Sequence, residues 1–141
     1  MTVRVRRAFE FEAPAERVWD FIADPRKRAE AISVVRDYDI DGNRATWHID
    51  LQLPLVDRTA TVETEDVERD EPRYVKFVGR SNVMRVTGEH RIESTETGCR
   101  LDNEFVVDGR LPGVERFFKK RLDTELTNLE AALRRDLELP A

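Results

Sequence analysis

The most regular pattern of apolar and polar positions lies near the end of the chain, between residues 112 and 137. Apolar residues recur there in steps of four and three, at Val114, Phe118, Leu122, Leu126, Leu129, Leu133 and Leu137. This spacing places them on one stripe of an α-helix, and polar residues occupy the opposite face. Such a helix owes most of its stability to burying its apolar face. The sequence therefore predicts one long helix that packs on a broad apolar surface.

Most of the preceding hundred residues alternate apolar and polar positions with a period of two, which is typical of strands with one covered and one wet face. A first strand is predicted at residues 3–12, and two short helices follow it. Asp24-Pro25 separates these helices because the residue before proline avoids the helical region, and the second helix spans residues 26–32. Further alternating strands extend to residue 107. This order predicts an α+β fold, in which a curved antiparallel sheet of about seven strands surrounds the long C-terminal helix.

Composition narrows the class of protein. A length of 141 residues with 40% hydrophobic content predicts one domain over residues 1–141. No apolar run approaches the ~20 residues of a membrane span, and the first residues lack the apolar core of a secretory signal, so we expect a cytoplasmic protein. A single cysteine, Cys99, excludes an internal disulfide and a cysteine metal cluster. The net charge of −5, with acids and bases interleaved, argues against a general nucleic-acid-binding protein.

Two inward-facing polar residues, His90 and Asn103, carry the most chemical information. If Glu93 lies opposite Arg100 across the turn at 94–98, His90 lies opposite Asn103, with the two Cβ atoms about 5 Å apart. A buried imidazole beside an amide can orient a ligand carbonyl or hydroxyl, or act as an acid or base. The alternative is a polar pair that satisfies its own hydrogen bonds beneath the helix.

Other candidates are weaker. Arg58 and Asp66 also fall in inward phase, and Arg58 is a candidate for binding a ligand carboxylate at a cavity mouth, or else a rim arginine in water. His48 lies on the polar face of its strand, opposite to His90, so the sequence predicts no metal site. No glycine-rich phosphate loop and no nucleophile elbow is present, which excludes nucleotide-dependent and serine-hydrolase chemistry.

The order of elements and a set of short motifs resemble the START-like helix-grip superfamily, in particular its polyketide cyclase/dehydrase and lipid-transport group. The similarity covers nearly the whole chain. The motifs that carry it are Ala13-Pro14-Ala15-Glu16-Arg17-Val18-Trp19, Asp24-Pro25, Thr61-Val62-Glu63, Asp70-Glu71-Pro72-Arg73, Gly98-Cys99-Arg100-Leu101 and Leu111-Pro112-Gly113.

The resemblance implies a cavity between sheet and long helix that binds a lipid, polyketide, quinone or sterol-like molecule, without a cofactor. One alternative is a polyketide cyclase, aromatase or dehydratase that uses His90 as its acid–base group. A second is an accessory subunit of a larger oxidoreductase, similar to the one known from carbon monoxide dehydrogenase, although the chain lacks the glycine-rich middle of that subfamily. Fold-level similarity does not choose among these functions. The residues expected to line the cavity are His90, Asn103, Arg58, Trp47, Ile49, Val62, Phe77, Val86, Phe105, Phe118, Leu122 and Leu126.

Overall fold

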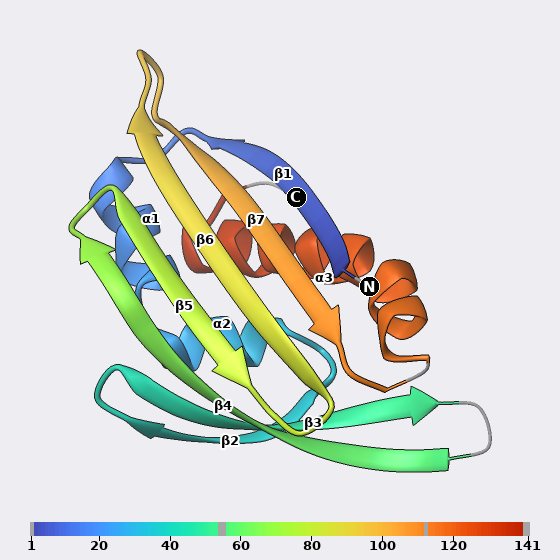
Figure 1. Ribbon diagram of the computed structural model, residues 1–141. Coiled ribbons are helices and arrows are strands. Elements are labelled where there is room, and N and C mark those ends of the chain that lie inside the picture. The colour runs from blue at the N-terminus through green and yellow to red at the C-terminus, as the bar shows by residue number, and fades with distance from the viewer. Residues whose placement is uncertain (1, 54–55, 112, 140–141) are drawn as a thin grey trace.

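The computed structural model describes residues 2–53, 56–111 and 113–139, without the side chains of residues 51–53 and 56–58. The described elements are, in chain order, β1 (Thr2–Phe11), α1 (Ala15–Ile22), α2 (Pro25–Ala31), β2 (Val35–Asp41), β3 (Arg44–Leu53), β4 (Val56–Asp70), β5 (Tyr74–Arg80), β6 (Met84–Ser94), β7 (Cys99–Gly109) and α3 (Val114–Asp136). Seven strands form one antiparallel sheet in the order β1-β7-β6-β5-β4-β3-β2. The sheet bends around α3, and α1 and α2 lie on the same side as α3 (Figure 1). The predicted α+β helix-grip architecture is confirmed.

The short helices form where the sequence predicts them. The Asp24 carboxylate accepts a hydrogen bond from the backbone N–H of Arg26 at 2.9 Å, and Pro25 occupies the first turn of α2. An aspartate cap followed by proline satisfies one free backbone donor and supplies a helical φ angle, which fixes the start of the helix. The helix spans Pro25–Ala31, so the predicted range of 26–32 begins and ends one residue too far along the chain.

The long helix α3 is shorter than the predicted range of 112–137. Its first residue is Val114, preceded by Gly113 at a φ of 93°, a conformation that favours glycine. Residue 112 lies outside the described residues. All seven residues of the predicted apolar stripe are buried, as predicted. The side chain of Glu125 is also buried beside this stripe, which the sequence analysis did not predict.

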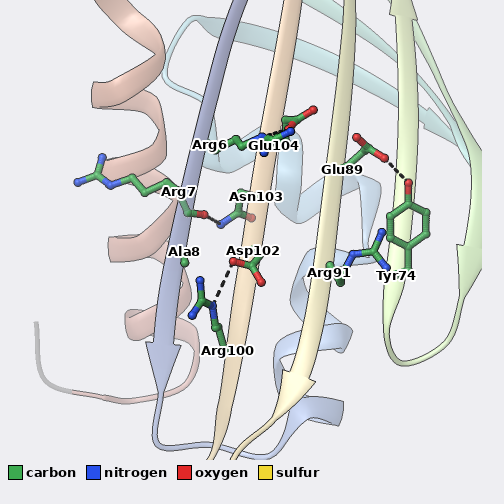
Figure 2. Close-up of a pocket in the computed structure, with 10 residues that line it drawn as sticks. All are labelled: Arg6, Arg7, Ala8, Tyr74, Glu89, Arg91, Arg100, Asp102, Asn103 and Glu104. Carbon is green, nitrogen blue, oxygen red and sulfur yellow. Dashed lines mark hydrogen bonds and ion pairs between the residues drawn. The ribbon is translucent and has the colours of Figure 1, made fainter.

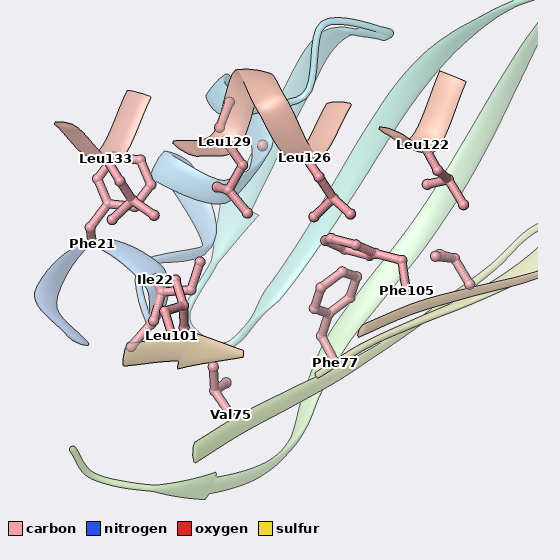
Figure 3. Close-up of a cluster of buried hydrophobic side chains, with 14 of the residues drawn as sticks. Phe21, Ile22, Val75, Phe77, Leu101, Phe105, Leu122, Leu126, Leu129 and Leu133 are labelled. Carbon is pink, nitrogen blue, oxygen red and sulfur yellow. The ribbon is translucent and has the colours of Figure 1, made fainter. Parts of the chain in front are cut away.

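The core fills the space between α3 and the concave face of the sheet. Figure 3 shows the leucines of α3 above the rings of Phe77 and Phe105, with Val75 on the same strand as Phe77 and Leu101 on the same strand as Phe105. Strand pairing places Glu93 opposite Arg100 and His90 opposite Asn103, so the register predicted for the β6–β7 hairpin is confirmed. A register shift between Asp66 and Glu68 interrupts the pairing of β4 with β5.

None of the helices in the described ranges is long and apolar enough to cross a membrane.

Candidate functional site

A small cavity lies between α3 and the sheet. Its volume is about 50 Å³. The sheet contributes aromatic and aliphatic side chains, α3 contributes Phe118, Leu122, Glu125 and Leu129, and α2 contributes Arg28. The cavity wall is therefore largely apolar, with titratable groups from Arg28, Glu125 and His90 among the described residues.

Most of the expected lining residues meet at this cavity. Those that line it are His90, Trp47, Ile49, Phe77, Val86, Phe105, Phe118 and Leu122. Val62 and Leu126 are fully buried in the core but do not line the described cavity. Asn103 is buried behind His90 rather than at the cavity wall. The side chain of Arg58 lies outside the described part of the chain, so its proposed role as a carboxylate ligand stays a prediction.

Phe77 is the centre of the aromatic part of the wall. Its ring meets the ring of Trp47 edge to face, with centroids 5.6 Å apart, and lies nearly parallel to the His90 ring at 6.2 Å. Phe105 packs against both Phe77 and His90, and the Arg28 guanidinium carbon lies 5.1 Å from the centre of the Phe77 ring. Such contacts hold rings in defined orientations. The three nitrogen-bearing side chains Trp47, His90 and Arg28 are therefore gathered around one phenyl ring.

The contacts of Asn103 determine which ring nitrogen of His90 carries the proton. The Asn103 Nδ2 amide donates a hydrogen bond to the backbone carbonyl oxygen of Arg7 at 3.1 Å. Because that partner can only accept, the amide oxygen Oδ1 must be the atom that faces His90. His90 Nδ1 lies 2.7 Å from this oxygen and therefore donates to it. In neutral His90 the proton is thus on Nδ1, and Nε2 carries a lone pair.

The surroundings of His90 favour this neutral form. Burial and the nearby Arg28 guanidinium lower the pKa of His90 to about 3, although the hydrogen bond to Asn103 opposes the shift. A protonated imidazole here would be desolvated and would lie close to a second cation. His90 is therefore a hydrogen-bonding group and a weak base at neutral pH.

This lowered pKa predicts an acid-sensitive fold. Between about pH 6.5 and pH 3 the unfolded chain binds a proton at His90 that the folded protein does not bind, so stability falls as the pH falls, by about 1.4 kcal/mol for each unit well inside this window. From pH 7 to pH 5, His90→Gln should lose about 2 kcal/mol less stability than the original protein. Urea unfolding at both pH values measures the difference. His48→Gln is the matched control, and equal losses for the original protein and His90→Gln would contradict the prediction.

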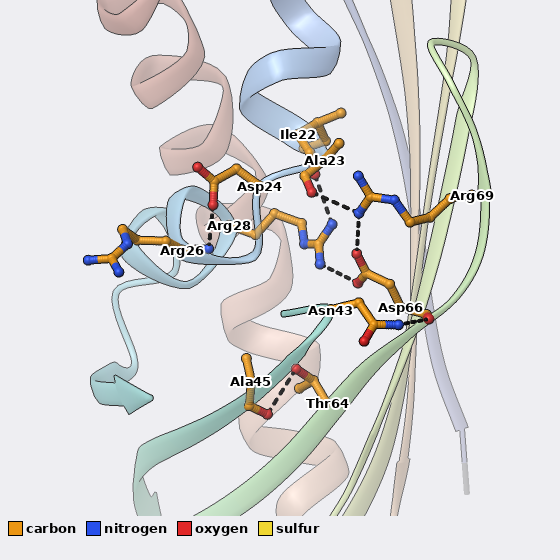
Figure 4. A network of polar contacts seen from close by, with 10 residues as sticks. All are labelled: Ile22, Ala23, Asp24, Arg26, Arg28, Asn43, Ala45, Thr64, Asp66 and Arg69. Carbon is orange, nitrogen blue, oxygen red and sulfur yellow. Dashed lines mark hydrogen bonds and ion pairs between the residues drawn. The ribbon is translucent and has the colours of Figure 1, made fainter. Parts of the chain in front are cut away.

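Arg28 belongs to a buried ionic network that joins α1, α2 and β4 (Figure 4). Its guanidinium donates from Nη1 to the carbonyl oxygen of Ile22 at 2.9 Å and from Nη2 to the carboxylate of Asp66. The same carboxylate accepts a hydrogen bond from Arg69 at 2.7 Å, and Arg69 also donates to the carbonyl oxygen of Ala23. Burial lowers the pKa of Arg28, and Asp66 opposes that shift. The network ties the end of α1 to α2 and β4, and through Arg28 it reaches the cavity wall.

Glu125 connects α3 with the segment between α2 and β2. Its carboxylate accepts hydrogen bonds from the backbone N–H of Ser33, at 2.7 Å, and from the Ser33 hydroxyl. The neighbouring residues Ile32 and Val34 line the cavity. The pair of Glu125 and Ser33 therefore fixes the position of this part of the cavity wall relative to α3.

Arg28 and Glu125 are the functional candidates that sequence reasoning missed. Both lie in segments rich in charge, where one more charged residue normally indicates the solvent face. A signal for Arg28 existed, because an inward-facing Asp66 requires a buried cation as its partner. Nothing in the spacing shows that this partner comes from α2.

A second hollow lies on the outer face of the sheet, where charged side chains of β1, β6 and β7 gather (Figure 2). These charges are largely paired with one another. Glu104 accepts from Arg4 and Arg6, Arg100 donates to Asp102, and the Tyr74 hydroxyl donates to Glu89. Exposed pairs of this kind contribute little stability. We interpret this face as a solvated surface.

The remaining reactive residues form no site with these groups. His48 lies on the outer face, where its Nδ1 is 3.5 Å from the Thr61 hydroxyl. Cys99 is buried, and burial raises the pKa of its thiol, which disfavours the reactive thiolate. Within the described ranges, no group of three or more His, Cys, Asp or Glu residues is arranged to hold a metal ion.

The curved sheet, the gripped helix and the apolar space between them define the class of helix-grip domains. The chain belongs to the family described as "Polyketide cyclase / dehydrase and lipid transport", whose model matches residues 2–134. The resemblance deduced from the sequence is thereby confirmed. A search of curated proteins finds no match.

Solved structures share the fold at low sequence identity. A START superfamily protein from Mycobacterium smegmatis has a TM-score of 0.75 at 15% identity, with 96% of this chain and 97% of that chain covered. A conserved protein from Geobacillus kaustophilus gives 0.70 at 14% identity, covering 96% and 95%. The protein TTHA0849 from Thermus thermophilus gives 0.69 at 18% identity, covering 94% and 97%. These similarities establish the fold alone.

Proposed function

We propose that this protein binds a small hydrophobic molecule, of the lipid, polyketide, quinone or sterol-like kind, between α3 and the sheet. The observation that carries the proposal is the apolar cavity, whose wall combines aromatic rings with a few buried polar groups. Small-molecule sites have this composition. Membership in a family described by polyketide chemistry and lipid transport supports the same class of ligand.

The volume of the cavity indicates that binding requires a rearrangement. About 50 Å³ has room for a few water molecules, whereas ligand sites commonly measure about 300–1,000 Å³. The wall contains flexible aliphatic side chains that can change rotamer, among them Met84 from β6 and Leu122 and Leu129 from α3. A ligand therefore selects a more open arrangement of α3 and the sheet. The contact of Glu125 with Ser33 is one of the polar links of α3 that such an opening would strain or break, and it is the one next to the cavity wall.

The cyclase or dehydratase alternative requires a group that moves a proton. His90 is the candidate, but its lowered pKa makes it a weak base, and its Nδ1 partner is an amide rather than a carboxylate. Binding without chemistry is therefore the function that the geometry favours.

A thermal-shift assay tests the proposal. Ligands that bind only the folded state raise the melting temperature, so a panel of long-chain and polycyclic lipophiles should contain compounds that do so in a concentration-dependent manner. Val107→Phe places a larger side chain at the cavity wall and should abolish the shift. Val106→Phe, one residue along β7 on the other face, is the matched control and should retain it. The absence of a shift across the whole panel would contradict the proposal.

A further inference from the structure

Three buried nitrogen atoms at the cavity have no hydrogen-bond partner among the described residues. They are Nε of Arg28, Nε1 of Trp47 and Nε2 of His90. All three residues line the cavity and pack around the ring of Phe77. The guanidinium carbon of Arg28 lies 5.1 Å from the centre of this ring, and the ring centroids of Trp47 and His90 lie 5.6 and 6.2 Å from it. Buried polar groups in folded proteins nearly always have a partner, so three exceptions around one ring require an explanation.

The chemistry of each nitrogen follows from its contacts. The indole nitrogen of Trp47 carries a hydrogen and can only donate. Nε of Arg28 is also a donor, and the other two guanidinium nitrogens are already engaged with Ile22 and Asp66. Nε2 of His90 is an acceptor, because the proton of the neutral ring is on Nδ1, where it is donated to Asn103. The site therefore presents two donors and one acceptor.

A hydroxyl group is complementary to this set. Its hydrogen can be donated to the acceptor while its oxygen lone pairs accept from the donors. We propose that the ligand of this cavity is a hydrophobic molecule with a neutral hydroxyl group, an alcohol, phenol or enol, that donates to His90 Nε2 and accepts from Trp47 Nε1 and Arg28 Nε. This inference rests on the proposed function and specifies the chemical class of the ligand.

Other head groups leave part of the site unsatisfied. An ether or ketone accepts from Trp47 and Arg28 but offers no hydrogen to His90. A carboxylate would place its negative charge against the lone pair of His90 and in the same cavity as the side chain of Glu125. A pure hydrocarbon would leave both donors and the acceptor buried without partners, which is costly. The hydroxyl compound should therefore bind most tightly.

Four probes with the same ring system separate these possibilities: 2-naphthol, 2-methoxynaphthalene, 2-methylnaphthalene and 2-naphthoate. Their dissociation constants are measured at pH 7 by competition with a bound fluorescent lipophile or by the fluorescence of the probes themselves. We expect 2-naphthol to bind about tenfold or more tightly than each of the other three, the usual worth of one or two buried hydrogen bonds.

Variants assign the preference to the named nitrogens. Trp47→Phe removes one donor and His90→Phe removes the acceptor while keeping an aromatic ring against Phe77. Each should reduce the ratio of methylnaphthalene to naphthol dissociation constants by about threefold to tenfold. His48→Phe, on the outer face of the sheet, should leave the ratio unchanged. If His90→Phe does not fold, Trp47→Phe alone decides whether the preference depends on this site.

The outcomes distinguish this inference from the proposed function. If the hydrophobic probes bind but 2-naphthol has no advantage over 2-methylnaphthalene or 2-methoxynaphthalene, the hydroxyl inference is wrong and the proposed function stands. Tightest binding of 2-naphthoate would likewise overturn the inference. A naphthol preference that persists in both variants would show that these nitrogens do not create it. If none of the four probes binds and the lipophile panel gives no thermal shift, both proposals fail.

Discussion

Replacing Asp66 with asparagine should lower the free energy of unfolding by about 3–5 kcal/mol, which is the usual cost of removing one partner from a buried ion pair. The Asp66 side chain is 1% exposed and that of Arg28 is 5% exposed, so water cannot take the place of the lost charge. The same substitution also weakens the contact with Arg69, which holds the end of α1. Asparagine keeps the size of the side chain, so the loss reports charge rather than packing.

Urea unfolding at pH 7 measures this effect, with Asp123→Asn as the matched control. Asp123 also pairs with an arginine, Arg7 at 3.1 Å, but its side chain is 79% exposed. Exposed pairs of this kind contribute about 0–1 kcal/mol, so the control should be nearly as stable as the original protein. A similar small loss for both variants would show that the network around Asp66 is better hydrated than its burial indicates.

The architecture was predictable because several local signals agree with one another. The stripe on α3, the two short helices separated by Asp24-Pro25 and the alternating strands all specify the same curved sheet over one helix, and each signal is local in sequence. The β6–β7 register was predictable because a short turn and a single in/out phase fix it, and this placed His90 opposite Asn103.

The site was predictable only in part, because its remaining features depend on contacts between distant segments. Val62 and Phe77 look alike as inward-facing apolar residues, yet Phe77 lines the cavity and Val62 is core. The difference arises from how α3 lies across the sheet, which periodicity does not encode. Arg28 was missed for the same reason, since its partner Asp66 lies 38 residues further along the chain. The unpartnered nitrogens of the cavity follow from side-chain orientation, which has no sequence signal.

Replacing Leu126 with aspartate should cost at least about 4 kcal/mol, because it places an unpaired carboxylate in the apolar interface of α3 with the sheet. Leu126 is fully buried, and the stripe to which it belongs is what holds α3 against the sheet. A loss of this size is a large part of the roughly 5–15 kcal/mol that stabilises a typical domain, so the variant should be partly unfolded at moderate temperature.

Thr124→Asp, on the exposed face of the same helix, introduces the same carboxylate two residues away and should change stability by less than about 1 kcal/mol.

The two variants should also differ in their response to pH. Burial raises the pKa of a carboxyl group, so the folded L126D protein binds a proton more readily than its unfolded chain, and its deficit relative to the original protein should shrink between pH 7 and pH 5. The T124D deficit should stay constant over the same range. Circular dichroism during urea unfolding at both pH values measures these differences. An L126D protein as stable as T124D would show that α3 is not gripped by the sheet in the way that the structure describes.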